Sequence, residues 1–172
     1  PNARYVGFGG APNVLGQMEC DASIMCGATL RSGAVGALRD YLHPIAVARQ
    51  VMERTPHVML VGEGAAMSAA EIGQVRSKMQ APQAKAEYDA WLRKNVPPPL
   101  QSEWPRVQLS KVVWSSAEDK TAKGTTCFLA RGQDGNWAGG ASTSGCAYKY
   151  PGRLGDSPII GAGLYVDNRY GA

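Results

Sequence analysis

Thr125 is the residue whose type and position best fit nucleophilic chemistry, because it follows Gly124 at the start of a run of β-forming residues. A threonine freed at a chain terminus can use its own α-amino group as the base that activates its hydroxyl. Such an amine has a pKa of about 7.7 to 8.0 in model peptides, so a large fraction is unprotonated near neutral pH. The preceding glycine permits the strained backbone that a self-cleaving peptide bond requires. Gly-Thr-Thr at the start of a strand is also an ordinary sequence, so a purely structural role stays open.

Two later segments offer groups that would complete a site around Thr125. Thr143 ends the second strand of the hairpin that Thr125 begins, so we expect its hydroxyl to donate a hydrogen bond to that of Thr125. Arg153 and Asp156 lie between glycines in the segment 152–158. A guanidinium binds a carboxylate through two parallel hydrogen bonds and a carboxylate holds an ammonium, so the pair matches the charged ends of an α-amino acid. The alternative interpretation is a surface ion pair.

Histidine and cysteine support less chemistry in this sequence. His43 precedes an expected helix and His57 opens an expected strand, which favours structural roles for both. The cysteines match no zinc spacing and include no Cys-x-x-Cys, so we expect neither a metal site nor a cofactor. We interpret all four as free thiols that fill the core: Cys20, Cys26, Cys127 and Cys146.

The composition fits one globular domain and excludes several function classes. The chain has 172 residues, of which 44% are hydrophobic, and a net charge of +4. No apolar run is long enough to cross a membrane, and no signal peptide is visible. The basic residues form no stripe, with Arg93-Lys94 as the densest pair, so we expect no nucleic-acid partner. The chain starts at Pro1 and stops without a closing element, so we expect it to be cut at both ends.

The elements that must position these residues alternate between helix and strand before a polar connector and are mainly strands after it. Residues 32–38 are compatible with either a helix or a strand. We expect an exposed, irregular connector over residues 98–124, including 115–120. The pattern predicts three helices, at 45–53, at 68–79 and at 84–94. The second of them is expected to begin at the capping box of residues 68–71. The pattern also predicts strands at residues 5–10, 17–25, 58–61 (buried), 125–130, 137–143 and 159–166, with a hairpin turn at 134–136.

The sequence resembles the glycosylasparaginase and isoaspartyl peptidase/L-asparaginase family of N-terminal nucleophile hydrolases. The resemblance rests on Gly124-Thr125, on Ser142-Thr143-Ser144-Gly145 and on Gly152-Arg153-Leu154-Gly155-Asp156-Ser157-Pro158, which follow one another at the family's spacing. The match covers most of the chain apart from the connector. Four blocks in the first half are similar to the glycosylasparaginase branch: residues 7–10, 21–25, 33–35 and 47–58.

This resemblance implies an α+β fold of the αββα sandwich type, incomplete at both ends. Residues 1–172 would form one truncated domain, with 1–124 resembling an α subunit and 125–172 the start of a β subunit. The implied partners are a small substrate derived from an amino acid and further copies of the processed α/β pair. No cofactor, membrane or nucleic acid is implied, and the compartment stays open.

The resemblance also implies the chemistry and the role of each site residue. An inactive precursor would cleave itself between Gly124 and Thr125, and the freed threonine would hydrolyse the side-chain amide of an asparagine derivative. Thr143 would tune this nucleophile. Arg153 would bind the α-carboxylate of the substrate, and Asp156 would bind its α-ammonium group.

Departures from the family pattern leave the substrate open between glycosylated asparagine, isoaspartyl dipeptides and free asparagine. Lys123-Gly124 stands where glycosylasparaginases commonly have His-Asp, and Cys26 stands where an Asp is usual. In the family, the oxyanion-hole residues follow a segment like 170–172, and a substrate-lining aromatic residue precedes a segment like Arg4-Tyr5. We therefore expect both features to lie outside residues 1–172. An unprocessed or truncated non-catalytic homologue is therefore the alternative of another class.

Overall fold

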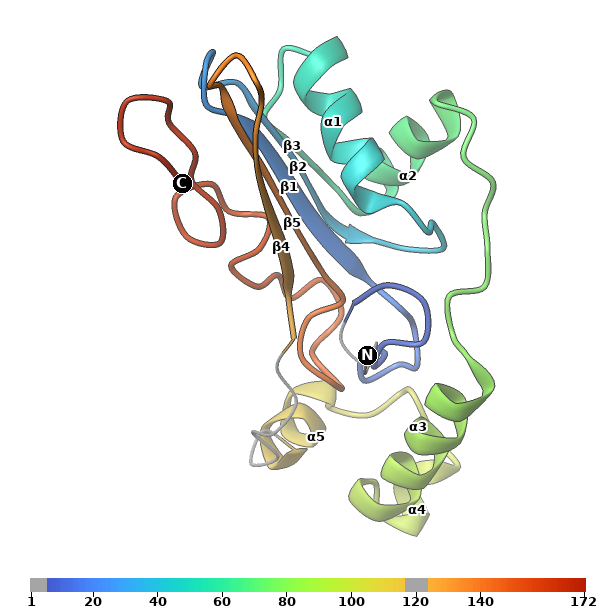
Figure 1. The fold of residues 1–172 in the computed structure, drawn as a ribbon. Coiled ribbons are helices and arrows are strands. Elements are labelled where there is room, and N and C mark those ends of the chain that lie inside the picture. The colour runs from blue at the N-terminus through green and yellow to red at the C-terminus, as the bar shows by residue number, and fades with distance from the viewer. Residues whose placement is uncertain (1–5, 117–123) are drawn as a thin grey trace.

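A five-stranded sheet lies at the centre of the computed structural model, which describes residues 6–116 and 124–172 (Figure 1). The strands lie in the order β3-β2-β1-β5-β4. All neighbouring pairs are antiparallel except β2 and β3, which are parallel. The strands are β1 (Cys20–Cys26), β2 (Ser32–Leu38), β3 (Met59–Val61), β4 (Thr126–Arg131) and β5 (Trp137–Thr143).

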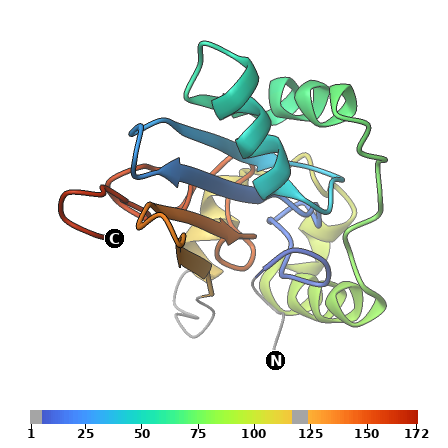
Figure 2. The ribbon, with the colours of Figure 1, turned by 45° about the horizontal axis from the view of Figure 1, so that its top comes forward.

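Helices α1 (Pro44–Arg54) and α2 (Gly62–Glu71) cover one face of this sheet (Figures 1 and 2). Pro44 lies in the first turn of α1, where its missing N–H costs no hydrogen bond. A Cβ at Gly33 would collide with the backbone of Ala48, so glycine allows α1 to approach β2 closely. Buried side chains of the sheet and both helices form the main core between these layers: Ala22, Val35, Leu38, Tyr41, Val47, Ala48, Val51, Ala65, Ala66 and Ala69.

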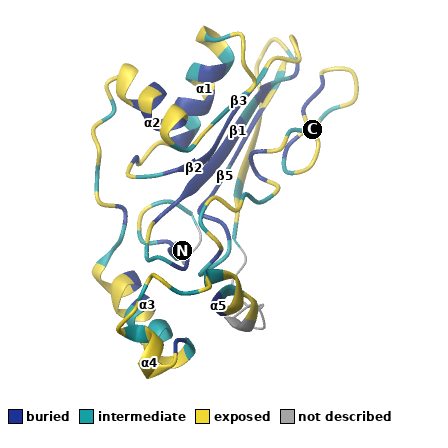
Figure 3. Cartoon of the chain, turned by 180° about the vertical axis from the view of Figure 1, so that it is seen from behind, coloured by how far each residue is buried: buried dark blue, intermediate teal, exposed yellow. Residues whose placement is uncertain are grey.

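The segment after β5 packs against the opposite face of the sheet (Figure 2). Leu164 and Val166 form a smaller core there with Met25 and Ala141. A Cβ at Gly139 would lie 2.8 Å from the side chains of both Leu164 and Val166, so glycine in β5 leaves the room they occupy. Figure 3 shows that the central strands β1 and β2 are largely buried and that β5 is buried over most of its length, whereas the edge strand β4 is mainly exposed.

Three further helices lie away from α1 and α2 in Figure 1, and two of them, the first and the last, pack around a separate core. They are α3 (Pro82–Asn95), α4 (Pro98–Gln101) and α5 (Leu109–Ser116). Val14, Val96 and Val112 are the buried residues of this core. Trp91 of α3 stacks on Tyr148 with ring centroids 4.2 Å apart, which joins α3 to the chain that follows β5.

The structure confirms most of the expected elements and corrects three of them. Residues 6–10 form bends and turns rather than a strand. Residues 159–166 also form turns, with only an isolated bridge between Ile160 and Leu164. The capping-box pattern at Ser68 lies inside α2, which begins at Gly62 and ends at Glu71, so no helix starts there. The chain leaves α2 through Gly73, whose φ of +75° suits the left-handed conformation that ends many helices.

The expected connector and the expected buried positions also need correction. Residues 98–116 contain α4 and α5, and Val112 is buried, whereas 117–123 lie outside the described residues. The ambiguous segment 32–38 is the strand β2. The short β3 is an edge strand and is only half-buried or exposed. All four cysteines are free thiols, but only Cys20 is buried, and Cys127 is exposed.

The α+β class is confirmed, whereas the αββα sandwich remains a prediction. A sandwich requires a second sheet packed on the first. The described residues form one sheet with helices on one face and irregular chain on the other. Among these residues, no helix has the length and apolar character needed to cross a membrane.

Candidate active site

All five residues singled out from the sequence line one open cavity at the end of the β4–β5 hairpin. The cavity has a volume of about 500 Å³. We call it the Thr125 cavity, and its lining residues come from the chain around the hairpin and from the loop that follows it: Gly124, Thr125, Thr143, Gly145, Cys146, Arg153, Gly155 and Asp156.

The register of the hairpin brings Thr125 to Thr143. Thr126 pairs with Ser142, so Thr125, which directly precedes β4, lies opposite Thr143 at the end of β5. The turn at the other end fixes this register. Gly135 there has a φ of +82°, and the Asp134 carboxylate accepts the backbone N–H of Asn136 at 3.1 Å, a bond that lowers the pKa of Asp134.

The hydroxyl of Thr143 bonds to the residue that precedes the expected nucleophile. It donates to the carbonyl oxygen of Gly124 at 2.8 Å and accepts the backbone N–H of Gly145 at 2.9 Å. Thr143 itself is only 3% exposed. The Thr143 hydroxyl therefore bonds to the carbonyl of the expected scissile bond.

The hydroxyl of Thr125 lies beside Ser157, which the sequence pattern did not indicate as a site residue. Its Oγ1 is 3.2 Å from Oγ of Ser157, which is fully buried. The Ser157 carbonyl accepts a 2.6 Å hydrogen bond from Ser23 in β1, which ties this part of the loop to the sheet. Ser157 follows Asp156 in the quoted segment, and this proximity in sequence was the only signal that could have found it.

Arg153 and Asp156 belong to one loop, residues 152–158, and both side chains are exposed at the cavity. The structure gives no ion pair between these two described residues, so the surface-pair interpretation has no support. Charged residues beneath the loop, also missed from the sequence, bind its backbone. Glu19 accepts the N–H of Gly152 at 3.1 Å, and Asp21 accepts that of Gly155 at 3.5 Å.

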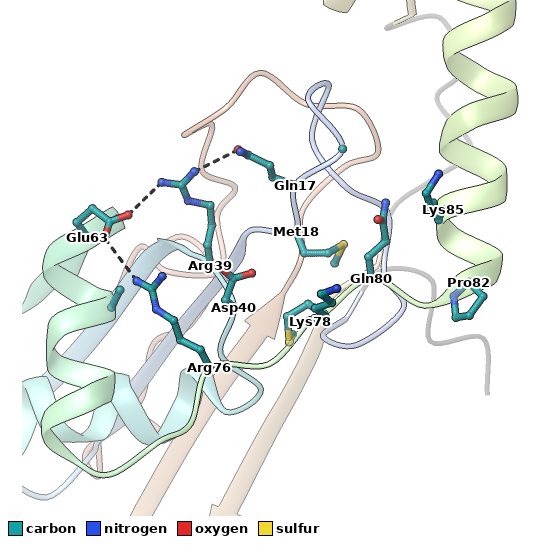
Figure 4. Close-up of a pocket in the computed structure, with 14 residues that line it drawn as sticks. Gln17, Met18, Arg39, Asp40, Glu63, Arg76, Lys78, Gln80, Pro82 and Lys85 are labelled. Atoms are coloured by element: carbon teal, nitrogen blue, oxygen red, sulfur yellow. Dashed lines mark hydrogen bonds and ion pairs between the residues drawn. The ribbon is translucent and has the colours of Figure 1, made fainter. Parts of the chain in front are cut away.

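A larger hollow of about 710 Å³ lies elsewhere (Figure 4). Its described lining holds no serine, threonine, cysteine or histidine. The cations labelled in Figure 4 are partly paired. Glu63 lies 3.2 Å from Arg39 and 3.7 Å from Arg76, and Arg39 also bonds to Gln17. The Thr125 cavity is therefore the candidate active site.

Other groups with catalytic potential lie outside the Thr125 cavity or are poorly suited to attack. His43 precedes α1 and accepts N–H bonds through its carbonyl, His57 is exposed before β3, and neither lines the cavity. Burial raises the pKa of the Cys20 thiol to about 11, which disfavours the thiolate. In the part of the chain that the structure describes, no three His, Cys, Asp or Glu residues are grouped to hold a metal ion.

A hairpin that sets a Gly-Thr junction opposite a second threonine, beside a loop with one arginine and one aspartate, is the arrangement that the resemblance predicts for an asparaginase. The asparaginase family model Asparaginase_2 matches residues 2–172, and the chain belongs to this family.

Three curated relatives, from Elizabethkingia miricola, Rattus norvegicus and Mus musculus, carry the name N(4)-(β-N-acetylglucosaminyl)-L-asparaginase. The protein from Elizabethkingia miricola is 40% identical over 172 residues, which cover 100% of this chain and 45% of that relative. The protein from Rattus norvegicus is 35% identical over 180 residues, which cover 97% of this chain and 52% of that relative. The protein from Mus musculus is 36% identical, with coverage of 97% and 52%. The chain thus spans about half the length of the curated relatives it matches.

Proposed function

We propose that the full-length protein hydrolyses the side-chain amide of asparagine derivatives, as a glycosylasparaginase-like enzyme with Thr125 as its nucleophile. The observation that carries this proposal is the 2.8 Å hydrogen bond from Thr143 to the Gly124 carbonyl, in the cavity that Arg153 and Asp156 also line. The printed names of the relatives support a glycosylated asparagine as the substrate.

The proposed first step is self-processing at the Gly124–Thr125 bond. The Thr125 hydroxyl attacks the Gly124 carbonyl, and the Thr143 hydroxyl stabilises the negative charge that develops on the carbonyl oxygen. Expulsion of the Thr125 nitrogen gives an ester between Gly124 and the threonine oxygen. Water hydrolyses this ester, leaving a carboxylate on Gly124 and a free α-amino group on Thr125. In this proposal, residues 1–124 and the chain from 125 onward become separate α-like and β-like segments.

In turnover, the same hydroxyl attacks the side-chain carbonyl of the substrate. The free α-amino group of Thr125 accepts the hydroxyl proton and returns a proton to the leaving amine. The resulting β-aspartyl ester on Thr125 is then hydrolysed by water, which releases aspartate. β-Branching restricts the rotamers of Thr125 and so helps to aim its oxygen.

Arg153 and Asp156 supply recognition of the amino acid in this scheme. The guanidinium binds the α-carboxylate and the aspartate carboxylate binds the α-ammonium, so the side-chain amide is directed toward Thr125. We include in the proposal that processed α/β pairs self-associate.

One observation favours a second candidate, an isoaspartyl peptidase/L-asparaginase. The Lys123-Gly124 junction is closer to that branch than the His-Asp common in glycosylasparaginases. Both candidates share Thr125 and differ in the group attached to the β-carbonyl.

Substrate hydrolysis by the full-length protein tests the proposal and separates the branches. We expect release of the glycosylamine from N4-(β-N-acetylglucosaminyl)-L-asparagine, and loss of this activity in Thr125→Ala. Faster turnover of β-aspartyl dipeptides or free asparagine would favour the second candidate. Absence of hydrolysis of all three substrates by the full-length protein would contradict the proposal and leave the non-catalytic alternative.

A further inference from the structure

A buried charge cluster lies beneath the loop that presents Arg153 and Asp156. Nζ of Lys149 is 3.8 Å from a carboxylate oxygen of Glu19 and 3.9 Å from one of Asp21. The side chains of Lys149, Glu19 and Asp21 are 1%, 4% and 0% exposed. We call these three residues the Lys149 cluster. Burying charge is costly even when it is paired, so three charged groups at one buried place indicate a role beyond filling space.

The two carboxylates of the cluster bind the loop on both sides of Arg153. The Glu19 oxygens accept the backbone N–H of Gly152 at 3.2 and 3.1 Å. Asp21 accepts the N–H of Gly155 at 3.5 Å through Oδ2, while its Oδ1 accepts the N–H of Ala37 at 2.9 Å. Because Asp21 belongs to β1 and Ala37 to β2, these hydrogen bonds hold the loop in place against the central sheet.

Lys149 joins this arrangement to the nucleophile side of the Thr125 cavity. A Cβ on Gly145 would lie 2.9 Å from Nζ of Lys149, so the ammonium lies directly against Gly145. Gly145 lines the cavity and donates its N–H to the Thr143 hydroxyl. Nζ has no hydrogen-bond partner among the described residues, so Lys149 acts on both carboxylates through charge.

We propose that the Lys149 cluster is a positioning device that sets Arg153 and Asp156 relative to Thr125. No member of the cluster lines the cavity, so the three residues act through the backbone of the loop. This inference rests on the proposed function, in which Arg153 and Asp156 bind the charged ends of the substrate. A displaced loop weakens the contacts of these two groups with the substrate in the ground state and the transition state alike. Since the loop binds substrate rather than reacting with it, the loss falls mainly on KM.

The first test compares Lys149→Met with Lys85→Met in the full-length protein, using N4-(β-N-acetylglucosaminyl)-L-asparagine as substrate. Both changes replace an ammonium by an unbranched apolar side chain, and Lys85 forms an exposed ion pair with Asp89 at 2.6 Å. We expect Lys149→Met to raise KM at least about tenfold with kcat per processed chain within about threefold. Lys85→Met should leave both within about twofold. A processed Lys149→Met protein with unchanged KM would overturn the proposal.

If the Lys149→Met variant does not fold, Glu19→Leu provides a second test of the positioning role. This change leaves one cation facing one carboxylate, so the remaining charges balance, but it frees the N–H of Gly152. We expect KM to rise about tenfold in Glu19→Leu and less in Glu19→Gln, whose amide oxygen still accepts that N–H. Equal KM values for Glu19→Leu and the unmodified protein would also overturn the proposal.

A crystal structure of full-length Glu19→Leu separates this proposal from the proposed function. We expect the 152–158 loop to shift relative to β4 and β5, and a loop in its original place would contradict the positioning role. This readout does not require turnover. If the unmodified protein hydrolyses none of the substrates, the proposed function fails, while the position of the loop still decides whether the Lys149 cluster sets it.

Discussion

The hydroxyl of Thr143 donates a 2.8 Å hydrogen bond to the carbonyl oxygen of Gly124, the atom on which charge would develop if Thr125 attacked its own peptide bond. The same hydroxyl accepts the N–H of Gly145 at 2.9 Å, which fixes its direction. A donor held in advance at this position costs no reorganisation during the reaction. The relation between these two residues therefore links the β4–β5 hairpin to the proposed self-processing step.

Replacing Thr143 by valine removes this donor while keeping nearly the same shape. We expect processing of full-length Thr143→Val to slow by about 100-fold to 1,000-fold, the loss typical of a missing oxyanion donor. A time course of intact mass after synthesis measures the rate. Thr143→Ser keeps the hydroxyl and should process much faster than the valine variant, and equal rates for the two variants would exclude a role for the hydroxyl.

Ser157 offers a separate test of the nucleophile's surroundings. Its Oγ lies 3.2 Å from Oγ1 of Thr125, so we expect Ser157→Ala to leave the nucleophile less well oriented. One hydrogen bond contributes about 0.5 to 1.5 kcal/mol, which corresponds to a fall in kcat of about twofold to 13-fold. Steady-state kinetics of processed protein should show this fall with little change in KM. A change confined to KM would place Ser157 in substrate binding instead.

The local hairpin and its residues could be predicted from the sequence because their signals are short-range. Asp134-Gly135-Asn136 specifies a turn, and the β-rich runs on either side set the register that brings Thr125 opposite Thr143. Pro44 likewise predicted the start of α1, because proline favours the first turn of a helix. The residue types of Arg153 and Asp156 indicated a site for an amino acid, and the family resemblance supported placing it beside Thr125, since nothing local joins their loop to the hairpin.

The remaining features depend on contacts between distant parts of the chain. Residues 159–166 have a strand-like composition but take turn conformations, with a φ of +88° at Gly161, while Leu164 and Val166 pack on the sheet face. The Ser68 pattern predicted a helix start, but tertiary packing places this serine, 6% exposed, inside α2. Glu19 and Lys149 are far apart in sequence and meet only in the fold, so the sequence pattern could not show them as one cluster.

The close approach of α1 to β2 yields a stability prediction. A Cβ at Gly33 would collide with the α1 backbone at Ala48, so Gly33→Ala should lower the free energy of unfolding by about 1 to 3 kcal/mol. Gly64 in α2 has no atom within 4 Å of its would-be Cβ, so Gly64→Ala should raise that free energy by about 0.8 to 1 kcal/mol. Urea unfolding of the full-length protein measures both changes, and destabilisation by both alike would contradict the packing described for β2.

Asp167 gives a prediction for acid stability. Hydrogen bonds from the side chain and backbone of Arg169 lower the pKa of this carboxyl from 3.8 to about 2. Because the pKa is lower in the folded state, the ionised carboxylate contributes stability above about pH 4, and this contribution is lost as the pH falls toward 2. Urea midpoints between pH 5 and pH 2 should therefore fall less steeply for Asp167→Asn than for the unmodified protein. Parallel curves would show that this carboxyl is not linked to folding.

Self-processing at the Gly124–Thr125 bond is tested by the intact mass of the full-length protein together with the N-terminal sequence of its fragments. We predict two fragments, the second beginning Thr-Thr-Cys at Thr125, and a single uncleaved chain for Thr125→Ala. A full-length protein that remains one chain under conditions in which it is folded, or a Thr125→Ala variant that is still cut between Gly124 and residue 125, would contradict this prediction.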